Sequence, residues 1–302
     1  MTEKERLKCL KAMPLMRGLS LPQLKKLSAL FKSAEFAAGS VLIEDNEKAD
    51  SLYLIAGGVA RVDKRLETHR DYRDLAFLGP GEFFGEMALA GHKARTARVV
   101  AQEPVEVLIL AGRDLRAWLK AERGAAGVFL MGMAQVLSER VKRTSEQLML
   151  FYDLSTVFAQ KTSSPKELFA RVSRHLLAHL GEGWSLAAGL YNVYNDEMDA
   201  VAVLGPRSPA LEQKLPQKVE SIQTKWLDET TYCAAVPSPQ DSIKACLLVC
   251  RPDAGDAAGC VQVARLIGGV ARLLGAAMEK AQQEQEEQLR DRLKAQANEP
   301  LL

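Results

Sequence analysis

Residues 78–99, LGPGEFFGEMALAGHKARTARV, constrain this chain more than any other stretch. Gly85 comes directly before Glu86, and Arg95 follows nine residues after Glu86. Glycine lets the backbone approach a bound group closely, and the first amides of a short helical turn can bind an anion. An arginine adds a permanently charged, bidentate partner for a phosphate. Because a carboxylate repels phosphate, Glu86 indicates a hydroxyl donor such as a ribose, and the stretch predicts a nucleotide site.

The sequence FGEMAL, followed by ARTARV, resembles the phosphate-binding cassette of cyclic nucleotide-binding domains. The usual form is FGE, a hydrophobic residue and AL, then Arg, a small residue and Ala. Residues 14–31 look like the leading helices of that domain, and residues 37–62 look like its first strands, with Gly39 and Gly58 at the expected turns. The resemblance therefore covers about residues 10–150 and implies a cyclic mononucleotide ligand, cyclic AMP or cyclic GMP, without a metal.

The resemblance implies roles for the residues of the cassette. Arg95 would bind the cyclic phosphate and Glu86 the ribose, and three residues would act through their backbone: Gly85, Met87 and Ala88. Thr96 does not choose the base. The Arg-Thr-Ala sequence is similar to that of cyclic GMP-responsive relatives, where the hydroxyl helps hold guanine, but in bacterial activators a hydroxyl here touches the phosphate of cyclic AMP.

Three residues depart from the pattern of the family. Asn46 stands where glycine is usual, which a left-handed turn tolerates. Ala94 replaces a common proline, and Arg98 replaces a small polar residue, so the far end of the cassette is expected to differ in shape.

Bulk properties describe an ordinary globular protein. A length of 302 residues allows about two domains. A net charge of +2 is too weak to argue for nucleic acid or an anionic membrane, and no run reaches the eighteen apolar residues of a membrane span. Five scattered cysteines, with Cys246 and Cys250 expected to pack on one face of a strand, indicate a reduced, cytoplasmic protein.

Catalytic signatures do not stand out, so we expect no enzyme. We find no Ser-His-Asp set, P-loop or paired catalytic carboxylates in the sequence. His175 and His179 are four residues apart on a predicted helix, but there is no HExxH glutamate and no evident third ligand, so packing or surface placement is expected rather than a metal.

The apolar pattern predicts an α+β fold. Residues 3–32 read as two or three short helices, with a cap at Ser20-Leu21-Pro22. Residues 36–110 read as short strands separated by turn residues, which predicts a jelly-roll-like β-roll. A short helix at 114–122, ended by Gly124, is followed by a long helix that starts near Gly127 and runs to about Gln160.

The long helix carries a heptad pattern that favours a parallel homodimer over a helix packed on its own domain. Its segment 133–147 resembles the dimerisation helix of the bacterial catabolite activator family, where a Thr-Ser pair reaches the purine from both subunits. That resemblance makes Thr144 and Ser145 base contacts, whereas a threonine bonded back within its helix is an equal alternative. The predicted seam consists of Ala134, Leu137, Val141, Thr144, Leu148, Phe151, Ser155 and Phe158.

The C-terminal half lacks the helix-turn-helix with which the activator family would continue. An amphipathic helix (165–181), a hairpin (184–195 and 199–205), a polar stretch (209–230), two strands and a long last helix (259–296) together look like a GAF domain, with a PAS-like fold as the alternative. We therefore expect a cyclic nucleotide-binding domain (1–126), a connecting helix (127–160), a GAF-like α/β sandwich (161–280) and a charged helical tail (281–302).

These features predict a cytoplasmic sensor, with cyclic AMP favoured over cyclic GMP, that signals through a dimeric helix and a GAF-like domain to a protein partner. DNA and membrane are not expected partners. Two other classes stay open: a dimeric scaffold whose nucleotide site is no longer used and, less favoured, a DNA-binding transcription regulator.

Overall fold

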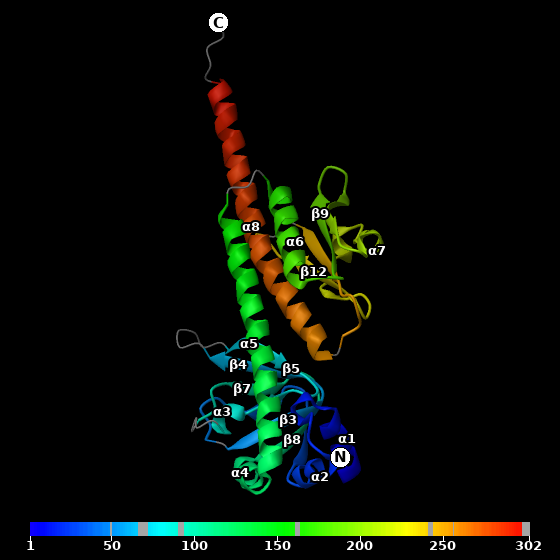
Figure 1. The fold of residues 1–302 in the computed structure, drawn as a ribbon. Helices are drawn as coiled ribbons and strands as arrows, with labels where there is room; N and C mark the ends of the chain where they lie inside the picture. Colours follow the sequence, from blue (N-terminus) through cyan, green and yellow to red (C-terminus); the bar gives the residue numbers. More distant parts are fainter. Residues whose placement is uncertain are drawn as a thin grey trace. The chain divides into compact units, whose positions relative to one another are not determined.

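The computed structural model describes residues 1–48, 50–65, 72–89, 94–160, 164–240, 244–255 and 257–297. The chain divides into two compact units. The first comprises Met1–Arg143 with Asp256–Gln262, and the second comprises Thr144–Gly255 with Val263–Leu302. Both mix helices with antiparallel sheets, which confirms the α+β class (Figure 1).

Short helices open the first unit: α1 (Glu3–Ala12), the 3-10 turn η1 (Pro14–Met16) and α2 (Leu21–Ser28). Ser20 and Gln23 form the capping box of α2, with proline in its first turn, as the sequence predicts. The buried leucines of these helices form one apolar cluster with strands β3 (Ser51–Gly57) and β8 (Val105–Ala111).

Two four-stranded antiparallel sheets, with orders β1-β8-β3-β6 and β2-β7-β4-β5, form the predicted β-roll (Figure 1). Ile55, Phe84 and Val107 of one sheet pack against Leu42 and Val99 of the other. The sequence did not predict two of the strands, β1 and β6. The remaining bounds are β1 (Lys32–Phe36), β2 (Val41–Ile43), β4 (Ala60–Arg65), β5 (Tyr72–Leu78), β6 (Phe83–Phe84) and β7 (Arg98–Ala101).

Left-handed backbone occurs at the turns expected from the sequence. Gly39, Gly58 and Asn46 have φ of 82°, 79° and 63°. A Cβ on Gly58 would lie 2.1 Å from the carbonyl oxygen of Pro104, so this turn requires glycine. Asparagine therefore replaces glycine at position 46 without changing the turn.

Helix α4 (Gly112–Ala121) ends at Glu122, whose backbone is not helical, and α5 (Arg123–Ala159) begins at the next residue. The predicted break at Gly124 and the predicted start near Gly127 are therefore wrong. A glycine costs a helix only about 1 kcal/mol, and the burial of Ala125 and Phe129 against the first unit outweighs that cost.

Helix α5 takes part in both cores. Ala125 and Phe129 are buried in the first unit, and Leu150, Leu154 and Val157 are buried in the second. This pattern corrects the predicted seam, because only some of its members face solvent. Leu137 packs against the first unit, and Phe151 and Phe158 pack against the second. The side chains that remain exposed are those of Ala134, Val141, Thr144, Leu148 and Ser155.

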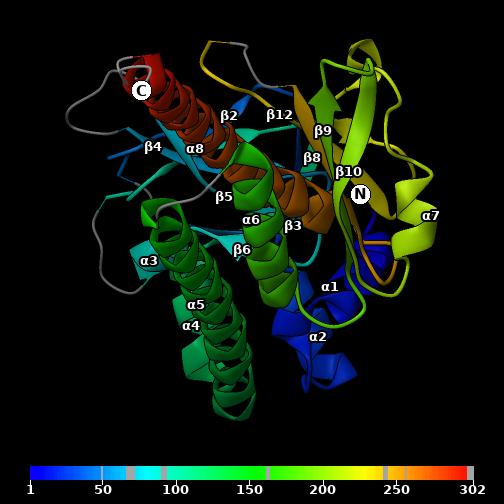
Figure 2. The same ribbon diagram turned by 90° about the horizontal axis from the view of Figure 1, so that it is seen from above.

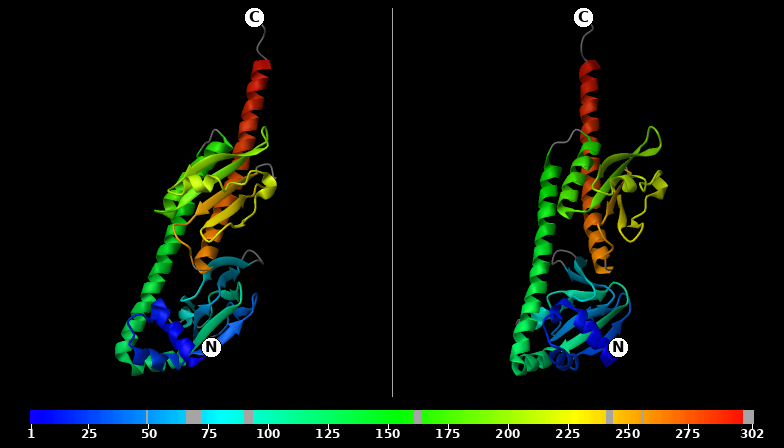
Figure 3. Two further views of the ribbon diagram at one scale, coloured as in Figure 1. Left: turned by 90° about the vertical axis from the view of Figure 1, so that its right-hand side faces the viewer. Right: turned by 45° about the vertical axis from the view of Figure 1, so that its right-hand side comes forward.

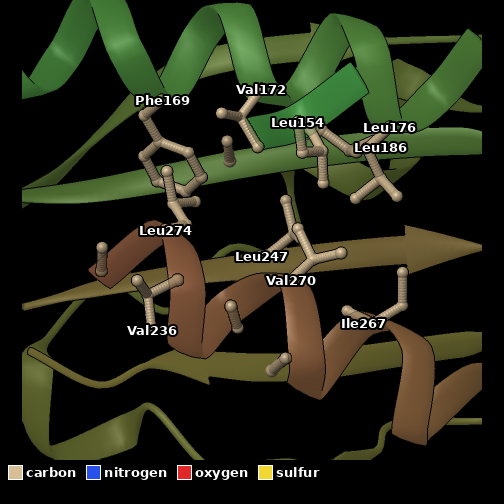
Figure 4. Close-up of a cluster of buried hydrophobic side chains, with 14 of the residues drawn as sticks. Leu154, Phe169, Val172, Leu176, Leu186, Val236, Leu247, Ile267, Val270 and Leu274 are labelled. Carbon is tan, nitrogen blue, oxygen red and sulfur yellow. The ribbon is translucent and has the colours of Figure 1, made fainter. Parts of the chain in front are cut away.

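The second unit is built on a five-stranded antiparallel sheet of order β10-β9-β13-β12-β11. Helices α6 and α8 lie on one face and α7 on the other (Figure 2). The larger core joins α5, α6 and α8 to the sheet, with Leu154, Phe169, Leu247 and Val270 among its members (Figure 4). Bounds are α6 (Pro165–Leu180), β9 (Ser185–Asn192), β10 (Glu197–Leu204), α7 (Ser208–Glu212), η2 (Val219–Ser221), β11 (Lys225–Trp226), β12 (Thr231–Val236), β13 (Ala245–Cys250) and α8 (Ala257–Ala297).

Both Cys246 and Cys250 face α7 in a small apolar cluster with Leu211 and Leu248, which confirms that they pack on one side of a strand. His179 lies within 2.8 Å of the Asp153 carboxylate.

Helix α8 continues past the sheet as a solvent-exposed extension (Figure 3). Among the described residues, one segment of it, Gly259–Asp291, is long and apolar enough to cross a membrane. A buried core helix passes the same test, but only 28% of the most apolar window of this segment is buried, although Ile267, Val270 and Leu274 of the helix are fully buried in the second unit.

Candidate functional site

The cassette begins where β6 turns into the four-residue helix α3 (Glu86–Leu89). Gly85 makes this turn with φ of 87°. A Cβ at this position would lie 2.6 Å from the Ser51 carbonyl oxygen and 2.7 Å from Nη1 of Arg95. The turn therefore requires glycine both for its backbone angle and for the close approach of the arginine.

Arg95 is only 5% exposed, and its guanidinium closes over the turn. Its Nη1 donates to the Gly85 carbonyl at 3.1 Å, and its Nη2 donates to the Ser51 carbonyl at 3.0 Å. These acceptors are neutral, and Nε is buried without a hydrogen-bond partner among the described residues. Arginine has five N–H donors, so the two bonds leave three for an anion.

The backbone of Arg95 is fixed from the opposite side by the turn at Asn46. Arg95 donates its N–H to the Glu47 carbonyl, and its own carbonyl accepts from Asn46, both at 3.0 Å. Below the guanidinium, the ring of Tyr53 lies with its centroid 5.7 Å from the arginine and stacks on Phe84 at 4.9 Å. Burial raises the pKa of Tyr53, and the nearby arginine opposes that shift. No sequence signal pointed to Ser51 or Tyr53, because they belong to a distant strand.

The other residues predicted for the cassette lie on α3 and at Thr96. Glu86 is partly exposed in the first turn of α3. The Thr96 hydroxyl donates to the sulfur of Met87 at 3.2 Å, so these two side chains meet. Ala88 lies in α3, with its side chain outside the described residues. Thr144 and Ser145 are exposed on α5 in the second unit and do not belong to the unit that holds the cassette.

Helix α5 also reaches the cassette inside the first unit, through two arginines that sequence reasoning missed. Arg140 donates to the Phe83 carbonyl, and its guanidinium lies over the Phe83 ring, 4.7 Å from the centroid. Nη2 of Arg143 donates to Glu82 at 3.1 Å. Burial lowers the pKa of Arg140, and Glu82 and Glu86 oppose that shift. The sequence signal for these contacts was the pair of arginines three residues apart on the helix. Their acceptors lie about sixty residues earlier in the chain, so the sequence alone did not identify them.

Arg98, which stands where the family usually has a small polar residue, pairs with a carboxylate. Arg98 forms two hydrogen bonds with the fully buried carboxylate of Asp63, at 2.8 and 2.9 Å. This contact raises the pKa of Arg98. Its guanidinium lies 3.3 Å from the centroid of the Tyr72 ring. Arg98 is thus committed to β4 and β5, and its charge is compensated.

Comparison with known proteins identifies the domain that carries this site. Residues 33–122 match the family model of the cyclic nucleotide-binding domain. The chain contains a cyclic nucleotide-binding domain. All the cassette residues from Gly85 to Thr96 lie inside the matched range.

Similar sequences occur both in a protein kinase and in a bacterial receptor protein. The chain is 35% identical over 95 residues to the cGMP-dependent protein kinase egl-4 of Caenorhabditis elegans, covering 31% of the chain and 12% of the kinase. It is 28% identical over 195 residues to the Cyclic AMP receptor protein of Thermus thermophilus, covering 64% of the chain and 80% of that protein. The chain therefore spans only a small part of the kinase.

Similar solved structures include the catabolite activator protein of Thermus thermophilus, at 26% identity and a TM-score of 0.39, covering 55% of this chain and 85% of that one. A cyclic nucleotide-binding domain from Methylobacillus flagellatus is 21% identical with a TM-score of 0.44, covering 49% of this chain and 82% of that one.

Proposed function

We propose that this protein is a cytoplasmic, non-catalytic sensor of a cyclic mononucleotide, with cyclic AMP favoured over cyclic GMP and no metal required. The observation that carries the proposal is Arg95, a buried arginine whose acceptors among the described residues are neutral carbonyls and whose remaining donors lie beside the Gly85 turn. A buried cation without a hydrogen-bonded counter-charge is costly, so an anionic ligand in this place is strongly favoured.

Each part of the ligand has a proposed partner. The cyclic phosphate accepts from Arg95 and from the amides that follow Gly85, since Arg95 can bind it while keeping its two carbonyl contacts. The ribose hydroxyl donates to the Glu86 carboxylate. The base is covered by Thr144 and Ser145 of α5, as the resemblance to the activator family implies.

The signal is proposed to travel along α5, because this helix belongs to the cores of both units. The second unit has the parts that the GAF-like resemblance predicts: a helix, central antiparallel strands and a long final helix. A ligand that prefers one of two placements of α5 would shift the population toward that placement. The output is proposed to be a protein partner rather than DNA or a membrane.

The exposed apolar residues of α5 support the proposed homodimer. Val141 and Leu148 are each 66% exposed and are seven residues apart, so they repeat at heptad spacing. Sedimentation equilibrium checks this directly. A dimer that Val141→Glu dissociates is expected, and a wild-type monomer at micromolar concentration would exclude dimerisation.

Calorimetric titration with cyclic AMP and cyclic GMP tests the sensor function. We expect binding to the wild type and a loss of at least about 100-fold in Arg95→Ala, since a charge-assisted phosphate contact is removed. Arg113→Ala is the matched control, because the Arg113 side chain is 83% exposed. Circular dichroism establishes that each variant is folded.

The titration also separates the alternatives. Tighter binding of cyclic GMP would identify a cyclic GMP sensor. A folded wild-type dimer whose melting temperature does not respond to either nucleotide at about 1 mM would indicate a scaffold with a degenerate site. A salt-dependent DNA complex would instead support a transcription regulator.

A further inference from the structure

Glu82, three residues before Gly85, contacts α5 through one of its carboxylate oxygens and its own turn through the other. Oε1 accepts from Nη2 of Arg143 at 3.1 Å and lies 4.0 Å from Nε of Arg140. Oε2 accepts from the backbone N–H of Gly79 at 2.9 Å. The Glu82 side chain is 18% exposed, so water screens these contacts less than those of a surface pair.

The turn that carries Glu82 is itself rigidly attached to the β-roll. Gly81 donates to the Ile55 carbonyl and Ile55 donates to the Glu82 carbonyl, both at 2.9 Å. Glu82 donates to the Gly79 carbonyl at 3.0 Å. The chain continues from Glu82 through β6 to Gly85. A displacement of the Glu82 side chain would therefore be passed directly to the cassette.

The first-unit part of α5 is held in two chemically different ways. At its start, Ala125 and Phe129 are fully buried, and Gly132 approaches the Leu15 backbone so closely that a Cβ would lie 2.7 Å from the carbonyl oxygen. Toward its end, Arg140 and Arg143 make polar contacts with Phe83 and Glu82. Apolar burial fixes the start, whereas the end depends on a few polar contacts, each of which a single substitution can remove.

We propose that Glu82 is a positioning residue that couples the cassette to α5 by holding Arg143, and that nucleotide affinity depends on this hold. The inference rests on the proposed function. Arg143 directly precedes Thr144, which is assigned to the base, so the Glu82 contact sets the helical turn from which the base contact starts. Arg140 contributes to the same coupling. Its Nε lies 4.0 Å from Glu82, and its charge interacts electrostatically with both Glu82 and Glu86, the proposed ribose acceptor.

Glu82→Gln removes the charge but keeps an oxygen that can accept from Gly79, and Arg143→Gln removes the other partner. Each single variant is expected to raise the nucleotide dissociation constant about fivefold and to accelerate hydrogen exchange of the amides around residues 140–146. The double variant is expected to bind no more weakly than Arg143→Gln alone, because that variant already removes the Glu82 contact together with the hydrogen bond from Nη1 of Arg143 to Gln262. Matched controls on exposed positions of the same helix are Glu139→Gln and Arg123→Gln.

The outcomes separate the two proposals. If the wild type binds nucleotide but both single variants bind and exchange like the controls, the coupling is wrong and the sensor function stands. If the single effects add in the double variant, the residues act independently and the coupling is also wrong. If the wild type binds neither nucleotide at about 1 mM, the sensor function fails and the coupling fails with it.

Discussion

Two arginines three residues apart lie in opposite chemical surroundings. In the cassette, Arg95 donates to the neutral carbonyls of Gly85 and Ser51. On the neighbouring strands, Arg98 donates both of its hydrogen bonds to the buried Asp63 carboxylate. A compensated charge holds strands together, whereas a charge whose acceptors among the described residues are carbonyls is suited to receive an anion. Under the proposed function, the first region would bind the ligand and the second would contribute stability.

Gly85→Ala is expected to have the largest effect on binding, because its Cβ would meet Ser51 and the Arg95 guanidinium within 2.7 Å. We expect at least about a 100-fold rise in the nucleotide dissociation constant by calorimetry. Gly39→Ala is the matched control, since its φ of 82° carries the same backbone strain but, apart from its chain neighbours, no atom of the described residues lies within 4 Å of its Cβ. Equal losses of affinity in both variants would show that strain alone matters and that the close approach to Arg95 does not.

Asp63→Asn is expected to reduce stability in the other region. Removing the charge of the fully buried Asp63 leaves the partly exposed Arg98 with a weaker partner and costs about 2–3 kcal/mol of unfolding free energy in urea. Nucleotide affinity should change less than about twofold, since Arg95 keeps its contacts. Asp114→Asn is the control, because the Asp114 side chain is 40% exposed and its ion pair is with the exposed Arg113. A large loss of affinity with unchanged stability would reverse the assignment of the two regions.

The cassette and most strands of the β-roll could be predicted because their signals are local. The glycine turn before Glu86 and the helix cap at Ser20 each depend on residues close together in sequence. The Asp63–Arg98 and Glu82–Arg143 pairs join residues 35 and 61 positions apart, so strand register and helix docking decide them. A periodic pattern of apolar residues specifies neither the strand register nor the helix docking that brings these pairs together.

The long helix shows the same limit. A heptad pattern identifies apolar positions but cannot tell whether they face a second copy or the same chain. Phe151 and Phe158 fit the pattern, yet both pack in the second unit, while Val141 and Leu148 remain exposed. The glycines also led to a wrong predicted start of α5. Gly124 and Gly127 favour helix ends, but the burial of Phe129 outweighs that preference.

Thr96→Ala sharpens the comparison within the cassette, where the hydroxyl now contacts Met87. If the hydroxyl reads guanine, cyclic GMP affinity falls about tenfold while cyclic AMP affinity stays within about twofold. If it touches the phosphate, both fall equally. Because cyclic AMP is the favoured ligand, we expect equal losses in paired titrations. A selective loss of cyclic GMP binding would contradict that choice, and Thr96→Ser should restore wild-type affinities in either case.

Tyr72→Leu is expected to cause the smallest loss of stability, and only through its contact with Arg98. The ring lies under the guanidinium at 3.3 Å, so its loss removes a cation–π contact worth about 0.5–1 kcal/mol at a partly exposed site. The Asp63–Arg98 hydrogen bonds remain, and the unfolding free energy should fall by that amount with nucleotide affinity unchanged. Tyr72→Phe keeps the ring face and should match the wild type. If Tyr72→Leu weakened nucleotide binding as much as stability, Arg98 would belong to the ligand site, and the division between the two arginines would fail.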